Sequence, residues 1–402
     1  MKLKSSEPFW LVKNGIIASY PSVKQDLETD ILIVGGGITG SLMAHQCIQD
    51  GYRVILTDRR EIAHGSTSAS TSMLQYEIDT PLYRLIDMIG EEGAVTSYQA
   101  CFEAIGHLGE IAASVRSHCG FEAKQSLYFA AFKKDLPWLE QEFEARHKYG
   151  FPVHWLSEEV ILSEYEMHHA YGGILSEQGA SVDIFRLTHD LLQHNIAKGL
   201  QVYDQTNIEE VRYKRNGIEA RTEYGTKIKA RKIVYCNGYE STETIKESFV
   251  RLLSTYALVG ECFEADEGNT LKDTLFWNTA DPYLYMRTTD DNRLLIGGGD
   301  EDFVNAQKRD HLIPAKEAKL RKQLERLMPD YELRTDFTWA GTFGATKDGL
   351  PYIGTHPDFK NAYFVLGFGG NGITFSVTGM QMLSAYLKGQ HHPLNHFFRF
   401  RR

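Results

Sequence analysis

The stretch DILIVGGGITGSLMAHQCIQDGYRVILTDRREIAHGSTSAST, residues 30–71, decides the fold of this chain. Residues 31–34 form a continuous apolar run, which is typical of a strand buried on both faces of a parallel sheet. The segment Ile38–Gln49 is compatible with a helix, and Asp50 and Gly51 suit its end. Val54–Thr57 is a second apolar run. This order predicts a strand, a turn, a helix and a parallel strand.

The glycines of the turn follow the spacing G-x-G-x-x-G, at Gly35, Gly37 and Gly40. In such a turn the first glycine permits the bend, the second lets a pyrophosphate approach the backbone, and the third lets helix and strand pack closely. The unpaired N–H groups near Ile38 and Thr39, at the start of the helix, favour phosphate oxygens. The turn therefore predicts a phosphate site.

An acidic residue, Asp58, ends the second apolar run, roughly 20 residues after Gly37. A carboxylate at this place can accept hydrogen bonds from a ribose diol. The glycine turn and the acid together indicate a Rossmann-like, dinucleotide-binding βαβ unit. The alternative is a glycine-rich turn that packs closely and holds no ligand.

A tract of small polar residues, HGSTSASTS at 64–72, follows Asp58 where a domain that binds NAD would continue with a helix and a strand. Hydroxyl and N–H groups at this density suit a second line of contacts along an extended cofactor. The alternative is a flexible serine-rich loop. We expect the contacts from Gly65, Ser66, Thr67, Ser70 and Thr71.

Composition excludes several other functions. The formal net charge of −10, without a basic stripe, argues against nucleic acid as a partner. The five cysteines are scattered and the histidines lack ligand spacing, so no metal site is expected. Apolar runs of roughly 18 residues are absent, which predicts no transmembrane segment. The first residues lack the apolar core of a signal peptide, so we expect a cytoplasmic protein.

The stretch from residue 30 to 71, with Arg59 next to Asp58, resembles the FAD-dependent D-amino-acid oxidase family, which includes glycine and sarcosine oxidases. Four later segments resemble the family in the same order, at 179–203, 232–241, 339–354 and 363–389. The resemblance implies an α/β fold. It would consist of an FAD-binding Rossmann-like domain of the glutathione-reductase type and a second α+β domain of antiparallel sheet and helices.

The FAD-binding domain is expected to be discontinuous, at 1–78, 170–245 and 338–402, with the substrate domain at 79–169 and 246–337. Strands are expected at 208–215, 218–222, 227–230, 233–235 and 363–366 in the first domain, with a helix at 373–387. In the second domain we expect helices within 81–115, at 135–149 and at 314–328, and strand-like segments at 249–264, 271–287 and 293–297.

The turn GFGGNG, residues 367–372, leads directly into the helix at 373–387, whose N-terminus can stabilise negative charge on a reduced flavin. The alternative is a turn that only permits close packing. Together, the motifs and the resemblance predict the following cofactor-binding residues: Gly35, Gly37, Ile38, Thr39, Gly40, Asp58, Arg59, Gly65, Ser66, Thr67, Ser70, Thr71, Val211, Asn237, Gly238, Gly341, Gly369, Gly370, Asn371, Gly372, Ile373 and Thr374.

Tyr283, Tyr285 and Arg287 alternate, so they share one face of a strand. The resemblance implies that this sheet covers the flavin. We therefore expect Arg287 to hold a substrate carboxylate and the tyrosines to wall the pocket. The alternative is a buried structural ion pair for Arg287 and core packing for the tyrosines. Phe343 stands where glycine oxidases tend to have an arginine, so a two-arginine clamp is not expected.

The function implied is oxidation of the C–N bond of an amine or amino acid by hydride transfer to FAD, which gives an imine that hydrolyses. Oxygen or another acceptor would then take the electrons, because the oxygen-activating lysine of sarcosine oxidases has no evident match here. The alternatives are an FAD-dependent dehydrogenase of a hydroxy acid or polyol, and a non-catalytic flavoprotein.

The first prediction concerns the attachment of FAD. Sarcosine oxidases bind flavin covalently through a cysteine near the C-terminus, but no cysteine follows Cys262 in this chain. We expect a yellow protein that releases its FAD into the supernatant on acid precipitation. Yellow colour that stays in the pellet would show a covalent bond and contradict the prediction.

Overall fold

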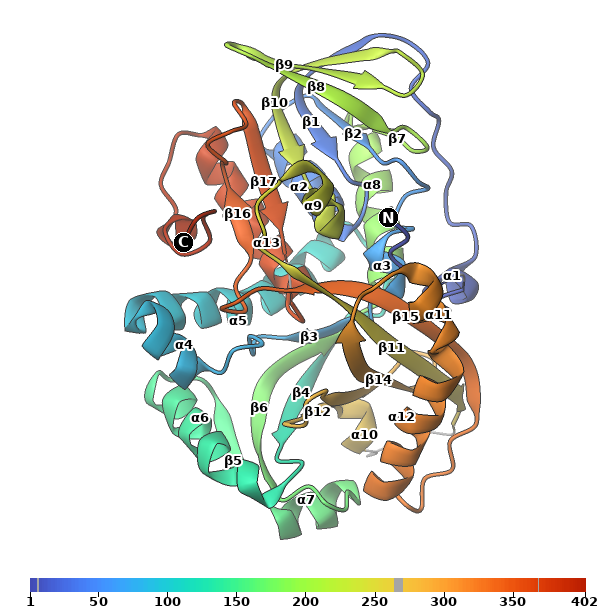
Figure 1. Cartoon of the computed structure of the whole chain (residues 1–402), viewed down its shortest axis with the longest axis vertical. Helices are drawn as coiled ribbons and strands as arrows, with labels where there is room; N and C mark the ends of the chain where they lie inside the picture. The colour runs from blue at the N-terminus through green and yellow to red at the C-terminus, as the bar shows by residue number, and fades with distance from the viewer. Residues whose placement is uncertain (6, 264–269, 368) are drawn as a thin grey trace.

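A computed structural model describes residues 1–5, 7–263, 270–367 and 369–402 of the protein. Two sheets, one above the other in Figure 1, are flanked by helices. The described residues form eight strands in the first sheet, in the order β16-β17-β10-β1-β2-β7, with β9 paired to β10 and β8 paired to β9. These strands are β1 (Leu27–Val34), β2 (Val54–Thr57), β7 (Gln201–Tyr203), β8 (Ile208–Lys214), β9 (Gly217–Thr222), β10 (Lys227–Tyr235), β16 (Tyr352–Gly354) and β17 (Ala362–Leu366).

The centre of the first sheet is parallel. Strand β1 lies between β10 and β2, and β17 pairs with the far side of β10, all in the same direction. Ile31, Leu32 and Ile33 are fully buried, as the apolar run predicts. Because parallel strands end at one edge of a sheet, the residues after β1, β2 and β10 meet there. The predicted α/β fold is confirmed.

The expected elements of the first sheet lie close to the observed ones. Helix α2 (Ile38–Gln49) and strand β2 have the predicted bounds. The segments 227–230 and 233–235, expected as two strands, form the single strand β10. Its first half pairs with β9 and its second half with β17, so one long strand joins two sheet regions.

The second sheet is mainly antiparallel and has nine strands, counted over the described ranges, in the order β15-β11-β14-β13-β12-β4-β6-β3, with β5 paired to β6. Its strands are β3 (Met73–Gln75), β4 (Glu122–Phe129), β5 (Val153–Ser157), β6 (Gly172–Ser181), β11 (Arg251–Cys262), β12 (Thr274–Asn278), β13 (Leu284–Thr288), β14 (Arg293–Asp302) and β15 (Thr335–Ala345). Glu264, at the end of one expected strand, lies outside the described residues.

The second sheet takes strands from segments that the sequence prediction gives to the FAD-binding domain. Strands β3 and β6 lie entirely within those segments, and β15 crosses the boundary at residue 338. Over the described strands, the chain passes between the two sheets as often as the domain prediction says, but at shifted positions, and the domain boundaries stay a prediction.

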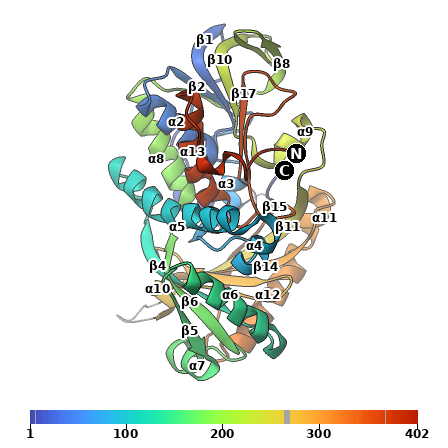
Figure 2. The ribbon, with the colours of Figure 1, turned by 90° about the vertical axis from the view of Figure 1, so that its left-hand side faces the viewer.

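Helices surround both sheets (Figure 2). Helix α2 packs against α8 and α13, and α13 also contacts α5, while α12 packs on β11, β14 and β15. The helices are α1 (Phe9–Asn14), α3 (Ser66–Ala69), α4 (Leu82–Ile89), α5 (Glu91–Ser114), α6 (Leu136–Lys148), α7 (Glu158–Tyr165), α8 (Ile184–Ile196), α9 (Ser241–Thr244), α10 (Thr270–Asp273), α11 (Ala306–His311), α12 (Ile313–Leu327) and α13 (Gly372–Leu387), with short 3₁₀ turns at Lys133–Asp135, Gly238–Glu240 and Pro393–Asn395. Among these helices of the described chain, none has the length and apolarity needed to cross a membrane.

A buried charge network joins α6 to β6 and to the segment after β3. Arg146 donates from Nε to Glu142 Oε1 at 2.6 Å and from Nη1 to Glu77 Oε1 at 3.1 Å. Ser176 donates to the same oxygen of Glu77 at 2.8 Å. The three charged side chains are almost fully buried. Desolvation raises the pKa of Glu77, and the charge of Arg146 opposes that rise.

We expect Arg146→Met to lower the free energy of unfolding by about 3–5 kcal/mol, because it leaves two buried carboxylates without their cation. Urea unfolding followed by circular dichroism measures this change. Arg212→Met is the matched control, since Arg212 is an exposed partner of Glu210 and its loss should leave the free energy of unfolding nearly unchanged. Equal stability of the two variants would contradict the structural role of the network.

Candidate active site

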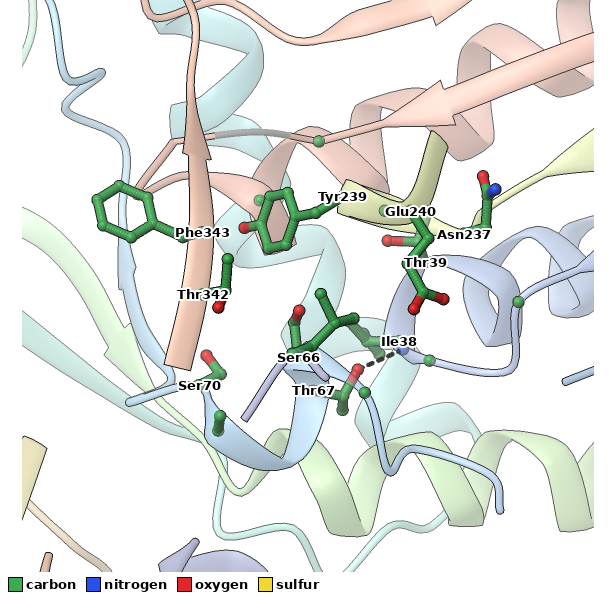
Figure 3. Close-up of a pocket in the computed structure, with 18 of the residues that line it drawn as sticks. Ile38, Thr39, Ser66, Thr67, Ser70, Asn237, Tyr239, Glu240, Thr342 and Phe343 are labelled. Carbon is green, nitrogen blue, oxygen red and sulfur yellow. Dashed lines mark hydrogen bonds between the residues drawn. The ribbon is translucent and has the colours of Figure 1, made fainter. Parts of the chain in front are cut away.

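One cavity of about 830 Å³ extends from the carboxyl edge of the first sheet to the second sheet. Its size lies in the range of ligand sites in proteins. The glycine turn after β1 and the residues after β2 and β10 line one end, and residues of β11, β15 and the loop before β13 line the other. Figure 3 shows part of the lining, with Ile38 and Thr67 near Ser66 and with Tyr239 near Phe343.

The glycine turn approaches its neighbours too closely for side chains. Gly35 has φ +111°, and a Cβ atom there would lie 2.4 Å from the carbonyl oxygen of Cys236. A Cβ atom on Gly40 would lie 1.8 Å from the carbonyl oxygen of Gly35. The N-terminus of α2 therefore lies against bare backbone, with its N–H groups at the cavity, as a phosphate site requires.

The serine-rich tract folds against the glycine turn. It contains the short helix α3, whose Thr67 accepts a hydrogen bond at Oγ1 from the backbone N–H of Ile38 at 3.1 Å (Figure 3). A Cβ atom on Gly37 would lie 2.8 Å from the same oxygen. The tract is thus an ordered wall of the cavity, held beside the start of α2. The N–H of Ile38, expected to be unpaired for a phosphate, is already bonded to Thr67.

Asp58 lies at the carboxyl end of β2 and faces the cavity. Its carboxylate accepts hydrogen bonds from the backbone N–H groups of Gly36 at 2.7 Å and Arg60 at 2.8 Å. Desolvation raises the pKa of Asp58, and these two N–H groups oppose the rise. Each carboxylate oxygen keeps a lone pair, so two ribose hydroxyl groups can still donate to it.

Glu240, which the sequence analysis did not identify, lines the cavity near Asp58. Its Oε1 accepts hydrogen bonds from both Arg59 and Arg60, and its Oε2 accepts a second one from Arg60 at 3.2 Å. The two arginines therefore lie beside a carboxylate that neutralises part of their charge. Glu240 is about 180 residues away in sequence, and no local motif marks it.

The opposite end of the cavity is aromatic and glycine-rich. Tyr283, Tyr285 and Phe343 line it, together with Gly369 and Gly370 just before α13. Gly369 has φ +74°, and a Cβ atom there would lie 2.4 Å from Oδ2 of Asp79. The N-terminus of α13 thus comes close to this end, where a positive helix end can stabilise an anion.

Most of the predicted cofactor-binding residues line this one cavity. The exceptions are Gly40, Asn371 and Thr374. Gly40 packs under the turn. The side-chain amide of Asn371 donates to the carbonyl oxygen of Gln75 at 2.9 Å. The hydroxyl of Thr374 donates to the backbone carbonyl oxygen of Asn371 at 3.0 Å, so both side chains hold the backbone at the start of α13. Phe368, within the predicted GFGGNG turn, lies outside the described residues.

Arg287 differs from the expectation, because it is absent from the lining of the cavity that the structure describes. Its guanidinium carbon lies 5.3 Å from the ring centre of Trp10, and its Nη2 donates to the carbonyl oxygen of Val182 at 3.3 Å. Desolvation lowers the pKa of Arg287 to about 10. Tyr283 and Tyr285 line the cavity, whereas Arg287 lies over Trp10 of α1. No local sequence pattern predicts the contact between Trp10 and Arg287. The position of the Arg287 side chain gives no support to a carboxylate clamp.

The cavity has further lining residues that the sequence analysis did not predict as cofactor contacts, some inside the motifs and some outside them. They are Leu3, Val34, Arg60, Ala69, Ser72, Met73, Gln75, Ile184, residues 206–209, Tyr213, Tyr235, Cys236, Tyr239, Glu240, Glu243, Thr244, Thr255, Tyr256, Ala257, Trp339, Thr342, Phe343 and Gly367. Several of these residues lie next to predicted ones, at the end of β10 and the start of β8. The sequence therefore already indicated those two parts of the lining. Those on β11 depend on the pairing of the second sheet.

The cavity fits FAD. Bare backbone and the start of α2 suit the pyrophosphate, Asp58 keeps acceptors for a ribose, and the length of the cavity reaches the aromatic end near α13. Asp58→Ala should weaken FAD binding by about 1.5–3 kcal/mol for each hydrogen bond lost to the ribose. Titration of the apoprotein with FAD, followed by fluorescence quenching, measures the dissociation constant. Asp87→Ala, at an exposed position of α4, is the control, and unchanged affinity of the Asp58 variant would refute the ribose assignment.

Comparisons with known proteins show the family of the chain. The family described as DAO, FAD dependent oxidoreductase, matches residues 30–385. Gamma-glutamylputrescine oxidoreductase of Escherichia coli K12 is 23% identical over 377 residues, 92% of this chain and 86% of that protein. Glycine oxidase of Geobacillus kaustophilus is 25% identical over 360 residues, 87% of this chain and 91% of that protein. A crystal structure of glycine oxidase from that organism has a TM-score of 0.77 at 20% identity and covers 94% of this chain and 99% of that one. The chain belongs to the DAO family of FAD-dependent oxidoreductases.

Proposed function

We propose that the protein oxidises the C–N bond of a small amine or amino acid, with FAD as the cofactor. The observation that carries the proposal is the continuity of one cavity from the glycine turn and Asp58 to the aromatic end at Tyr283 and Tyr285. A cofactor bound along it brings its reactive end to the tyrosines. Two relatives support the choice of chemistry, since they are named for the oxidation of an amine and of an amino acid.

Bound FAD supplies the acceptor for a hydride from the carbon next to the substrate nitrogen. The chain's own residues prepare that step. Tyr285 is nearly buried, and with Tyr283 and Phe343 it walls off water from the reacting carbon. The N-terminus of α13, held by Asn371, directs its positive end to this region. The substrate needs only to present a neutral amine, and the imine product hydrolyses in water.

The oxidation state of the flavin tests the proposal directly. Under anaerobic conditions, the purified holoprotein should lose its flavin absorbance near the usual visible maximum when mixed with glycine, sarcosine or an alkylamine, and a carbonyl product should form. Lactate and glycerol 3-phosphate are the controls for hydroxy-acid and polyol oxidation. Reduction by a control alone would overturn the proposal, as would a flavin that dithionite reduces and no amine does.

The electron acceptor follows from a second stage of the same experiment. We propose that oxygen or a small acceptor reoxidises the flavin, since both reach a cavity of this size. Oxygen and an artificial acceptor are added separately to the reduced protein, and the rate of recovery of absorbance is compared. Fast recovery with oxygen indicates an oxidase, and recovery with the artificial acceptor alone indicates a dehydrogenase.

A further inference from the structure

The charged side chains of the cavity lie at one end. Among the described residues of the lining they are Asp58, Arg59, Arg60, Glu209, Glu240 and Glu243. All six lie on β8 or in the segments after β2 and β10, so they belong to the first sheet. Residues 6, 264–269 and 368, which lie outside the described ranges, include no lysine, arginine or histidine. The cations that line the cavity are therefore near the proposed phosphate and ribose sites.

Aromatic side chains of the second sheet and its loops form the other end. The ring centres of Tyr283 and Tyr285 lie 5.6 Å apart. A Cβ atom on Gly297, next to a bulge in β14, would lie 2.2 Å from the ring of Tyr285, so bare backbone leaves space for that ring. Trp339 and Phe343 of β15 also line the cavity. Such rings bury alkyl groups and attract cationic amines, so this wall suits an amine with an apolar substituent.

Two buried arginines lie outside the described lining, and other groups hold each of them. Arg309 donates from Nη1 to the hydroxyl of Thr342, a lining residue, at 2.9 Å, and from Nε to the carboxylate of Asp310 at 2.9 Å. Arg287 lies over the ring of Trp10. Since neither guanidinium group lines the described cavity, neither offers a charged partner to a substrate there.

The start of α13 is the other source of positive potential, and a carboxylate of the protein already uses part of it. Both carboxylate oxygens of Asp79 accept the backbone N–H of Gly370 at 3.1 Å. Gly370 lines the cavity, whereas Asp79 is absent from the described lining. A substrate carboxylate would compete with Asp79 for this N–H group, and with the reduced flavin for the rest of the helix end. The aromatic end therefore offers little to an anionic substrate.

We propose that the substrate is an amine without a carboxylate group, and that the aromatic end holds its apolar part. This inference rests on the proposed amine oxidation and specifies its substrate class. A carboxylate moved into this end would lose its water without gaining a cation of the described lining, which costs free energy, whereas an alkyl or aryl group gains free energy there. The chemical step is unchanged: the carbon next to nitrogen gives a hydride to FAD, the nitrogen loses a proton, and water hydrolyses the imine.

Compounds with one branched carbon skeleton test the inference: 3-methylbutylamine, leucinamide and leucine, the last two as both enantiomers. Anaerobic reduction of the flavin is followed as a function of concentration. We expect half-saturation by 3-methylbutylamine and by the better enantiomer of leucinamide at concentrations about 10- to 100-fold lower than by leucine, because only leucine brings a carboxylate into the cavity. Equal responses, a preference for leucine or glycine, or a leucinamide response as weak as that of leucine overturns the inference and leaves amine oxidation intact. A flavin that no amine or amino acid reduces overturns the proposed function itself.

A pair of variants tests the electrostatic cause. Phe343→Lys and Phe343→Met place side chains of similar length in the aromatic end, one with a charge and one without. Leucine should half-saturate the lysine variant at a concentration about 10- to 100-fold lower than the methionine variant, because its carboxylate gains a charged partner, and 3-methylbutylamine should show no such gain. Phe132→Lys, at an exposed position outside the described lining, is the control for an added charge. FAD content and the unfolding midpoint verify that the variants fold. Equal responses of the lysine and methionine variants to leucine would overturn the inference.

Discussion

The close approach of three backbone segments at the glycine turn is the constraint on which the rest of the structure depends. Strand β1, helix α2 and strand β10 converge where Gly35 contacts Cys236 and Gly40 contacts Gly35, at distances that leave no space for a Cβ atom. This convergence brings the start of α2 to the ends of the parallel strands. Asp58 and the serine-rich tract can then surround one end of the cavity.

Charge is arranged along the cavity in a definite order. At the end near Asp58, two arginines lie beside Glu240, so their charge is available to a polyanionic cofactor but partly compensated. At the aromatic end, the described lining carries no charged side chain, and the helix end of α13 supplies the positive potential. The charged groups of the described lining therefore lie near the proposed phosphate site, apart from the aromatic end where the proposed amine would react.

The sequence predicted the first sheet well because its signals are local. Apolar runs, glycine spacing and the acid after β2 are read within residues 30–71, and the fold of that segment is as expected. The predicted residues also converge on one cavity. What could not be predicted depends on distant pairing. Glu240 comes to Arg59 through the ends of β10 and β2, and Trp10 covers Arg287 through the packing of α1. The faces of β14 depend on a bulge that periodicity does not show.

Two of the side chains proposed to wall the substrate pocket lie in one short hairpin. Tyr283 lies just before β13 and Tyr285 on it, and β13 pairs with β14, whereas the contacts proposed for FAD come from both halves of the chain. Changes in this hairpin can therefore alter what is recognised while cofactor retention stays under separate control. The hairpin is therefore the segment to exchange between relatives in order to transfer substrate specificity. Gly298 and Gly299, at the bulge in β14, must be exchanged with it.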